Sequence, residues 1–498
     1  MADDAKDRHN VWEVQIDGPK TPSRGVMSSI DGAPQVGTST IADGSQPTTG
    51  LPVPRRFWAA LSIWSAIFLT IMDVSIANVA LPFISKGLAI TAAKSVWAIN
   101  AYQIAIVMAL LPMAKAAEIL GYKKVYLGGL LLFMLAAFGS INASSLAVLA
   151  SSRFVQGIGA AAVMVVSGAL VRTIYPPALV PRGIGYNTIA VSIASAAGPA
   201  VGAFVLSIAG WHAIFAVGLP FGLLALALGF WAIPLTGSQK KPFDYRSALL
   251  CCAGFAAIFL FLNDLAQDSV SRWTLLSIGV AIPAIWFLGK RTTANQDSMV
   301  PLDLLKLDSL RTAYAMSATA YAVMMLITLS FPFILQQRFH FKPETIGLFM
   351  VPLPLGIVIA AFVSGRLVSR YPSAWLCASG LIVLTGGAIW LSLLQPGVSA
   401  LLIVAAAAIC GIGFGIFQVP NNHSMIAIAP HARAGAASAM LSLSRLIGQT
   451  LGAIVAALLF RRFGAQSDAP IIAAALIALA VASATLLRKD LSRSAMVE

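Results

Sequence analysis

The chain has 498 residues, of which 58% are hydrophobic and only 10% are charged. Soluble proteins carry about 25% charged residues, so this composition excludes a chain of ordinary soluble domains and intrinsic disorder over most of the length. The net charge of +14 comes from Lys and Arg in short loops between apolar runs, so we expect contact with a lipid bilayer and none with nucleic acid. The apolar runs are about 20 residues long and do not alternate with polar residues, which predicts an all-α membrane protein and not a membrane β-barrel.

The first 54 residues are polar and rich in Gly, Ser, Thr, Asp and Pro. They contain no charged-then-apolar segment followed by a small-residue cleavage site, so no secretory signal is predicted. This composition favours a disordered cytoplasmic tail over residues 1–54. The first apolar run begins at Phe57 and is expected to stay in the mature protein.

Fourteen apolar runs follow, each long enough, or nearly so, to cross a membrane. A span needs about 20 residues, because a helix rises about 1.5 Å per residue and the hydrocarbon layer is about 30 Å thick. The runs cover residues 57–84, 95–113, 125–141, 146–171, 184–208, 214–233, 248–265, 275–288, 313–335, 346–363, 374–394, 400–419, 436–459 and 471–487.

The distribution of Lys and Arg predicts the orientation of these runs. If the N-terminus is inside and the runs alternate, inside loops and flanks hold more than twice as many basic residues as outside loops, which hold only seven. The seven are Lys86, Lys94, Arg272, Arg338, Lys342, Arg461 and Arg462. A missed or extra run would remove this bias, so we expect an even number of spans in the cell (inner) membrane, with both termini in the cytoplasm.

Three pairs of similar segments recur at nearly constant offsets, which predicts two related halves. Gly198 to Gly202 and Gly448 to Gly452 are 250 residues apart, and two further pairs of segments are 251 and 254 apart. The predicted organisation is a six-helix bundle over 55–235, a two-helix insert with linkers over 236–310, and a second six-helix bundle over 311–498. Related halves around a site near the middle of the membrane are typical of transporters.

Asp73 is the only acidic residue near the middle of any run. A carboxylate there costs several kcal/mol unless it faces a cavity, finds a partner or binds a proton. Desolvation favours its protonated form, which a proton carrier requires. Arg153 is predicted at a similar depth in the fourth run, with Gln156 about one turn further on. A permanently paired, structural Asp73 and a helix-clamping Arg153 are the alternatives.

Small residues in the fifth run, at Ala190, Ala194, Gly198 and Gly202, recur every four positions and permit close helix contact. Pro199 allows this helix to bend. The alternative is close packing with no role in gating.

Several polar side chains inside runs are candidates for the substrate pathway, with ordinary interhelical hydrogen bonding as the alternative. They are Asn78, Asn100, Gln103, Gln156, Gln418, Asn421 and Arg445.

Catalytic and cofactor motifs are missing from the sequence. We find no phosphate-binding glycine loop, no HExxH and no GxSxG, so we expect no enzymatic activity, no cofactor and no metal. The four cysteines lie in or at the edge of apolar runs and are interpreted as packing residues.

Four segments resemble motifs of the fourteen-span drug:proton antiporters in the major facilitator superfamily. Met72–Pro82 reads M-D-V-S-I-A-N-V-A-L-P and resembles the first-span motif L-D-x-T-I-V-N-V-A-L-P. Arg153–Ala161 resembles R-x-x-Q-G-x-G-A-A, and Gly198–Gly202 resembles the antiporter motif G-P-x-x-G-G. Trp211–Pro220 is similar to the W-R-W-x-F…P segment that opens the sixth span.

The loop after the second run is a weaker match to the superfamily motif G-x-L-a-D-R-x-G-R-R. It keeps an acid, a glycine and a basic pair as Glu118, Gly121, Lys123 and Lys124, but it lacks the first Gly and the Arg. The resemblance implies that these four residues form a latch between the halves on the inner side.

The resemblance also implies a major facilitator fold, with two six-helix bundles and a two-helix insert, and a function as a proton-coupled exporter of amphipathic, cationic drugs. Its partners would be a small-molecule substrate, protons and the bilayer, and the chain would act as a monomer. Asp73 would carry or gate the proton and Arg153 would tune it. Gly198, Pro199 and Gly202 would shape the gating helix. The alternative is a superfamily member that exports or imports one specific metabolite or peptide, with Arg445 favouring an anion. A membrane enzyme or a receptor is a more distant alternative.

Overall fold

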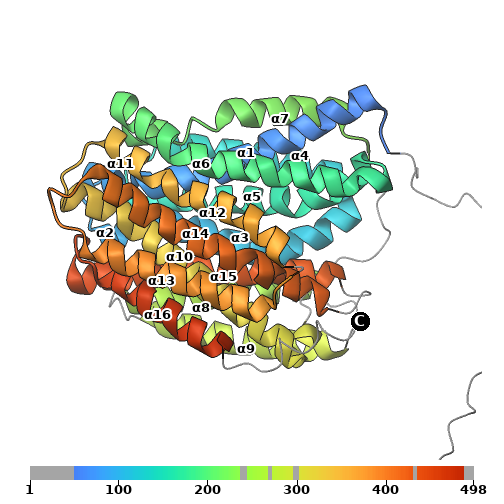
Figure 1. Ribbon diagram of the computed structural model, residues 1–498. Helices are drawn as coiled ribbons and strands as arrows, with labels where there is room; N and C mark the ends of the chain where they lie inside the picture. The colour runs from blue at the N-terminus through green and yellow to red at the C-terminus, as the bar shows by residue number, and fades with distance from the viewer. Residues whose placement is uncertain are drawn as a thin grey trace, which may run out of the picture. The chain divides into compact units, whose positions relative to one another are not determined.

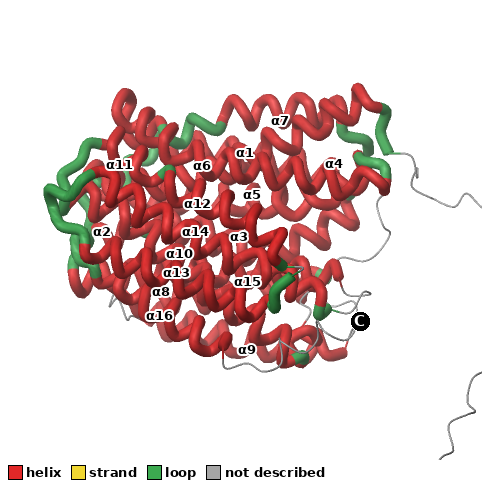
Figure 2. The backbone as a smooth tube through the Cα atoms, in the orientation of Figure 1, coloured by secondary structure: helices red, strands yellow, loops and turns green. Residues whose placement is uncertain are grey.

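The computed structural model describes residues 50–235, 244–266, 272–294, 302–368, 370–429 and 434–486. Within these ranges every regular element is a helix (Figure 2). Residues 1–49 of the predicted tail lie outside the described part, as do residues 236–243, 267–271 and 295–301 of the predicted insert. The first helix begins at Val53, inside the segment predicted as tail.

The fully described segment 50–235 contains seven α-helices (Figure 1). They are α1 (Val53–Gly87), α2 (Ala92–Ser95), α3 (Trp97–Leu120), α4 (Tyr122–Ile141), α5 (Leu146–Ile174), α6 (Val180–Ala213) and α7 (Leu219–Ala232). A short 3-10 helix at Pro177–Leu179 joins α5 to α6.

The described residues after 243 contain nine further α-helices and a 3-10 helix, Leu302–Lys306. The pair α8 (Tyr245–Ala266) and α9 (Arg272–Ala294) comes first. It is followed by α10 (Asp308–Gln337), α11 (Pro343–Met350), α12 (Pro352–Leu367), α13 (Ser373–Leu393), α14 (Ala400–Ala427), α15 (Ala434–Phe463) and α16 (Ala469–Leu486).

Twelve helical segments in the described part are long and apolar enough to cross a membrane. Two shorter apolar helices, Leu219–Ala232 and Thr274–Leu288, coincide with the sixth and eighth predicted runs. Helix α7 has 14 residues and is therefore about 21 Å long, less than the thickness of the hydrocarbon layer. It is short because residues 214–218, at the start of the sixth predicted run, form turns and not helix. The fourteen-span count therefore stays a prediction.

The long helices pack in two sets that repeat the same pairs. Helix α1 packs against α6 and α7, and α10 packs against α15 and α16 in the same way. Helix α5 contacts α3 and α4, as α14 contacts α12 and α13. Helix α8 packs on α9 and also touches α3 and α15, one helix from each set. We refer to α1–α7 as the N-terminal set and to α10–α16 as the C-terminal set.

Glycines permit the closest contacts in both sets. A Cβ atom placed on Gly198 of α6 would collide with the Ser75 Cβ atom of α1, and one on Gly202 would lie 3.0 Å from Ile76 Cγ2. In the C-terminal set, Cβ atoms on Gly448 and Gly452 of α15 would collide with backbone carbonyls of α10. The two glycine pairs that recur 250 residues apart therefore occupy equivalent helix contacts.

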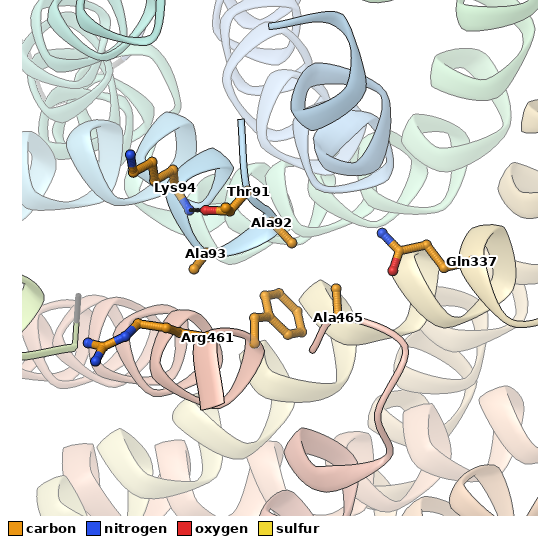
Figure 3. A pocket seen from close by; sticks show the side chains of 8 residues that line it. Thr91, Ala92, Ala93, Lys94, Gln337, Arg461 and Ala465 are labelled. Atoms are coloured by element: carbon orange, nitrogen blue, oxygen red, sulfur yellow. Dashed lines mark hydrogen bonds between the residues drawn. The ribbon is translucent and has the colours of Figure 1, made fainter. Parts of the chain in front are cut away.

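The two sets meet at the end of the bundle near residues 88–95 and 338–342, which we call the predicted outer end. There α11 contacts α6, and a Cβ atom on Gly347 would collide with the side chain of Ala203. Helix α2 contacts α15. A cavity of about 460 Å³ lies between α2 and the ends of α10 and α15 (Figure 3).

Candidate transport site

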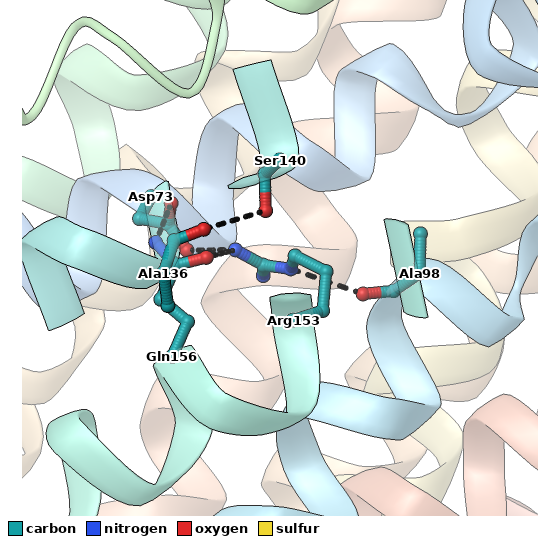
Figure 4. A network of polar contacts seen from close by, with 6 residues as sticks. All are labelled: Asp73, Ala98, Ala136, Ser140, Arg153 and Gln156. Atoms are coloured by element: carbon teal, nitrogen blue, oxygen red, sulfur yellow. Dashed lines mark hydrogen bonds and ion pairs between the residues drawn. The ribbon is translucent and has the colours of Figure 1, made fainter. Parts of the chain in front are cut away.

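Asp73, Arg153 and Gln156 form a buried polar network between α1 and α5 (Figure 4). Arg153 Nη1 donates to Asp73 Oδ2 at 2.5 Å and to Gln156 Oε1 at 2.9 Å. Gln156 Nε2 donates to Asp73 Oδ1 at 3.0 Å. Both carboxylate oxygens are therefore engaged, and each of the three side chains contacts the other two. The similar depths predicted from sequence correspond to direct contact.

Arg153 is held on several sides. It is fully buried, and its Nε atom donates to the Ala98 carbonyl of α3 at 3.1 Å. Its guanidinium carbon lies 4.3 Å from the centre of the Tyr102 ring and 5.5 Å from that of Phe215, distances at which a cation is attracted to an aromatic face. Its Nη2 atom has no hydrogen-bond partner among the described residues. Arg153 thus joins α5 to both α1 and α3.

A buried ion pair of this kind responds strongly to protonation. The Asp73 residue is 8% exposed, so both charges of the pair are largely removed from water. Two buried charges are tolerated because each neutralises the other, and removing one charge leaves the partner uncompensated. A proton on Asp73 would cancel the attraction to Arg153 and weaken the link between α1 and α5. The arrangement can therefore act as a structural clamp or as a proton-dependent switch.

The amides predicted to line a pathway are buried near this network. Asn78, Asn100 and Gln103 are all less than 7% exposed. Gln103 Nε2 approaches the Met325 sulfur of α10 at 4.0 Å, which is a contact between the two sets. The Oδ1 atom of Asn78 and the Oε1 atom of Gln103 have no hydrogen-bond partner among the described residues. These oxygens are acceptors that a donor on a transported molecule could satisfy.

A second polar cluster lies in the C-terminal set. Gln418 Nε2 of α14 donates to the Tyr321 hydroxyl of α10 at 2.7 Å, and Arg445 of α15 lies close to the same hydroxyl. The Tyr321 ring also packs edge-on against Phe414 at 5.0 Å. Gln418 and Arg445 were predicted from the sequence, whereas Tyr321 was not, because a tyrosine inside an apolar run resembles a core residue. Asn421 is buried, and its Nδ2 atom has no partner in the described part.

The residues of the predicted inner latch bond within the N-terminal set. Glu118 pairs with Lys115 at 2.7 Å, one turn away on α3. Lys123 Nζ donates to the Phe230 carbonyl at 2.7 Å, near the end of α7, while Lys124 is exposed. Gly121 has φ 92°, a conformation that favours glycine, and it forms the turn from α3 to α4. None of these contacts reaches the described residues of α10–α16, so the latch between halves stays a prediction.

The gating-helix residues lie where three helices meet. Gly198 and Gly202 face α1, and the Pro199 carbonyl lies against Gly347 of α11. The predicted antiporter motif therefore contacts both sets. Apolar helices, two sets with repeated packing and an ion pair buried within the spans together define a multi-pass membrane transporter.

Comparison with known proteins identifies the family. The sequence model of the Major Facilitator Superfamily matches residues 63–453 and, separately, 313–495. The uncharacterized transporter YebQ of Escherichia coli (strain K12) is 36% identical over 448 residues, which cover 89% of this chain and 98% of YebQ. The chain belongs to the Major Facilitator Superfamily, and it is a transporter and not an enzyme.

More distant relatives differ in what they are named for. The multidrug resistance protein Stp of Mycobacterium tuberculosis (strain CDC 1551 / Oshkosh) is 31% identical, covering 78% of this chain and 72% of Stp. The riboflavin transporter RibZ of Clostridioides difficile (strain 630) is 27% identical, covering 83% and 89%. A solved POT family transporter in complex with 5-aminolevulinic acid has a TM-score of 0.67 at 16% identity, covering 88% of this chain and 98% of that chain. This last likeness concerns the fold.

Proposed function

We propose that the chain is a fourteen-span, proton-coupled exporter of amphipathic, cationic compounds. The observation that carries this proposal is the contact of Asp73 with Arg153 and Gln156, buried within the spans. An acid in that position must be neutralised by a partner or by a proton, and the two alternatives define two states of the protein. The proposal places the protein in the inner membrane as a monomer, with both termini in the cytoplasm.

The proposed cycle uses the ion pair as the switch. In one state Asp73 is ionised and accepts hydrogen bonds from Arg153 and Gln156. When Asp73 takes up a proton, Arg153 keeps its bond to Ala98 but loses its counter-charge, and α1 is released from α5. Helix α1 packs on α6 through Gly198 and Gly202, and it also touches α10. A change in the pair can therefore reach the contact between the two sets.

The preference for cationic drugs is supported by Asp73 and by the relatives. Stp is named as a multidrug resistance protein, and LfrA of Mycolicibacterium smegmatis, 25% identical over 432 residues, is named as a multidrug efflux pump. An acid that alternates between charged and neutral forms attracts a cation in only one of them, which would tie cation binding to proton release.

A specific metabolite as the substrate is the second candidate, favoured by the cluster in the C-terminal set. Arg445, Gln418 and Tyr321 offer mainly hydrogen-bond donors and one positive charge. Such a group suits a planar substrate rich in carbonyl oxygens or one with a negative charge. RibZ is named as a riboflavin transporter, so riboflavin is a reasonable probe of this alternative.

The experiment measures transport driven by a pH gradient in proteoliposomes containing Asp73→Asn. An amide cannot cycle a proton, so gradient-driven accumulation of ethidium should be lost. Asp308→Asn is the matched control, because Asp308 is an exposed acid paired with Arg311 at 2.8 Å. Full accumulation by Asp73→Asn would remove Asp73 as the proton carrier.

Loss of activity must be separated from loss of folding. Asp73→Asn leaves the Arg153 charge buried without a carboxylate, so a lower melting temperature is expected. The double variant Asp73→Asn/Arg153→Gln removes both charges and should regain much of the stability while remaining uncoupled. To choose between substrates, Arg445→Gln should spare ethidium transport if cations are the substrates. It should abolish riboflavin transport if the second candidate is right.

A further inference from the structure

The C-terminal end of α7 is bonded by two basic side chains that come from other helices. Arg55 of α1 donates from Nε to the Ala232 carbonyl at 3.0 Å. Lys123 of α4 donates from Nζ to the Phe230 carbonyl at 2.7 Å. These two carbonyls are two residues apart on one helix, so they differ in height by about 3 Å. The two charged groups therefore converge on one helix end, and the charge of Arg55 repels that of Lys123.

This helix end lies at the end of the bundle opposite α2 and α11, which we call the predicted inner end. Figure 1 shows the start of α1 beside the end of α7 there. Helix α7 has 14 residues and is about 21 Å long, whereas the hydrocarbon layer is about 30 Å thick. The chain also stays apolar beyond the helix, at Ile233 and Leu235. The two cations are therefore expected at the edge of the hydrocarbon layer, reaching carbonyls that lack helical partners.

The two cations have no acidic partner among the described residues. The Nη atoms of Arg55 form no hydrogen bond or ion pair there, and Lys123 has one further contact, with the Phe230 ring at 5.6 Å. Glu118, which precedes the turn into α4, is paired with Lys115 at 2.7 Å. A carbonyl satisfies a donor without neutralising its charge, and a helix C-terminus offers only about half a negative charge. This end of α7 thus keeps most of two positive charges.

The surface next to these charges is apolar. Phe230 and Trp231, in the last turn of α7, are 74% and 62% exposed, and Leu235 is 79% exposed. Exposed apolar side chains beside uncompensated cations suit a ligand with an anionic head and an apolar body. Cations at this level of a membrane attract anionic lipids.

We propose that the inner end of α7 binds the headgroup of an anionic phospholipid. The phosphate would lie beside Arg55 and Lys123, and the acyl chains would pass along the exposed side chains of Phe230 and Trp231. The apolar surface favours a lipid over free phosphate, which has no apolar part. Because the two cations come from α1 and α4 and already contact α7, a bound headgroup would hold these three helices together.

The test is native mass spectrometry of the full chain titrated with phosphatidylglycerol and, separately, with phosphatidylcholine. The wild type should retain one phosphatidylglycerol molecule more tightly than phosphatidylcholine. Arg55→Gln and Lys123→Gln should each weaken this binding about fivefold, the contribution expected of one basic residue near a membrane surface, and the double variant about 25-fold. Lys123→Arg keeps the charge and should bind like the wild type.

The matched control is the double variant Arg56→Gln/Lys124→Gln. It removes two positive charges from the neighbouring positions, and neither side chain bonds to α7 in the described part: Arg56 lies over the Tyr175 ring and Lys124 is exposed. It should bind phosphatidylglycerol like the wild type. Melting temperatures in nanodiscs extend the comparison, because phosphatidylglycerol should stabilise the wild type and this control more than Arg55→Gln/Lys123→Gln.

Three outcomes overturn the proposal. Equal retention of the two lipids by the wild type would exclude a site for an anionic lipid. Equal losses in the two double variants would reduce the effect to general charge attraction. Equal stabilisation of all proteins by phosphatidylglycerol, or a response to inorganic phosphate alone, would leave the two cations as a cap of α7 or as a site for a free anion. If the double variant does not fold, the single variants and Lys123→Arg give the same comparison. Asp73→Asn should bind the lipid normally, so this proposal and the proposed proton coupling can fail independently.

Discussion

A side chain added to the glycine face of α6 should disrupt its contact with α1 most where the least room is available. A Cβ atom on Gly198 collides with the Ser75 Cβ atom, which cannot rotate away because it is fixed to the backbone. A Cβ atom on Gly202 lies 3.0 Å from the Ile76 Cγ2 methyl, which must give by only a few tenths of an ångström. The two positions therefore predict different costs for the same substitution.

The magnitudes follow from two opposing effects. Replacing a helical Gly by Ala stabilises by about 0.5–1 kcal/mol, because it reduces the backbone freedom of the unfolded chain. Overpacking a close contact costs about 1–3 kcal/mol. Gly202→Ala should therefore be close to neutral, whereas Gly198→Ala and Gly202→Leu should be destabilising or should separate α1 from α6. Gly185→Ala, in the same helix with nothing within 4 Å of the added Cβ atom, should be slightly stabilising.

The assay combines thermal melting of the purified variants with pH-driven transport in proteoliposomes. We expect the melting order Gly185→Ala, wild type and Gly202→Ala, then Gly198→Ala and Gly202→Leu, with transport lost in the last two. Normal melting and normal transport by Gly198→Ala would show that α1 and α6 do not approach as closely as the structure indicates. That result would refute the role of this face in gating.

Three further perturbations test other parts of the structure. Arg153→Lys loses the planar guanidinium that contacts Asp73, Gln156 and Ala98 together, so it should weaken pH-driven transport. Because it keeps the positive charge, the loss should be smaller than that of Arg153→Ala, and equal losses would contradict this. In a cysteine-free background, Lys240→Cys and Lys290→Cys should label only from the cytoplasm and Val270→Cys only from outside, and labelling of all three from one side would contradict a spanning insert. Arg338→Ala should lower stability by about 1 kcal/mol, because it removes a partly buried ion pair in which the Arg338 Nη1 atom contacts both Asp468 oxygens, and an unchanged melting curve would show that the pair contributes nothing.

The helical class could be predicted from the sequence, and so could the residues that meet between α1 and α5. An acid and an arginine inside apolar runs are costly, so their isolated positions and similar depths indicated a pair. The contact of Lys123 with the Phe230 carbonyl could not be predicted, because it depends on where α7 ends and leaves carbonyls without helical partners. The shortness of α7 results from the turns at residues 214–218, which an apolar run does not reveal.

Tyr321 is a second residue whose contacts could not be predicted from the sequence. Its hydroxyl is bonded by Gln418, 97 residues away in the chain, because α10 and α14 pack together. Composition and spacing cannot predict which of many buried aromatic residues meets such a partner. The helix contacts at the glycine repeats could be predicted, since close helix contact requires small residues and these are visible in the sequence.

The helix packing is repeated in the two sets, but the charged residues are not. This difference constrains the mechanism that couples proton binding to transport. Both sets use paired glycines for the same helix contacts, so the scaffold is nearly duplicated. The polar groups are not duplicated: the buried acid lies in the N-terminal set, and the sequence between Glu344 and Asp468 contains no acidic residue. In the proposed cycle a proton would therefore act on Asp73 in one set, and the other set would respond through its helix contacts. Protonation and the response of the second set would then be linked through the contacts that α1 and α6 make with α10 and α11, since these elements join the two sets.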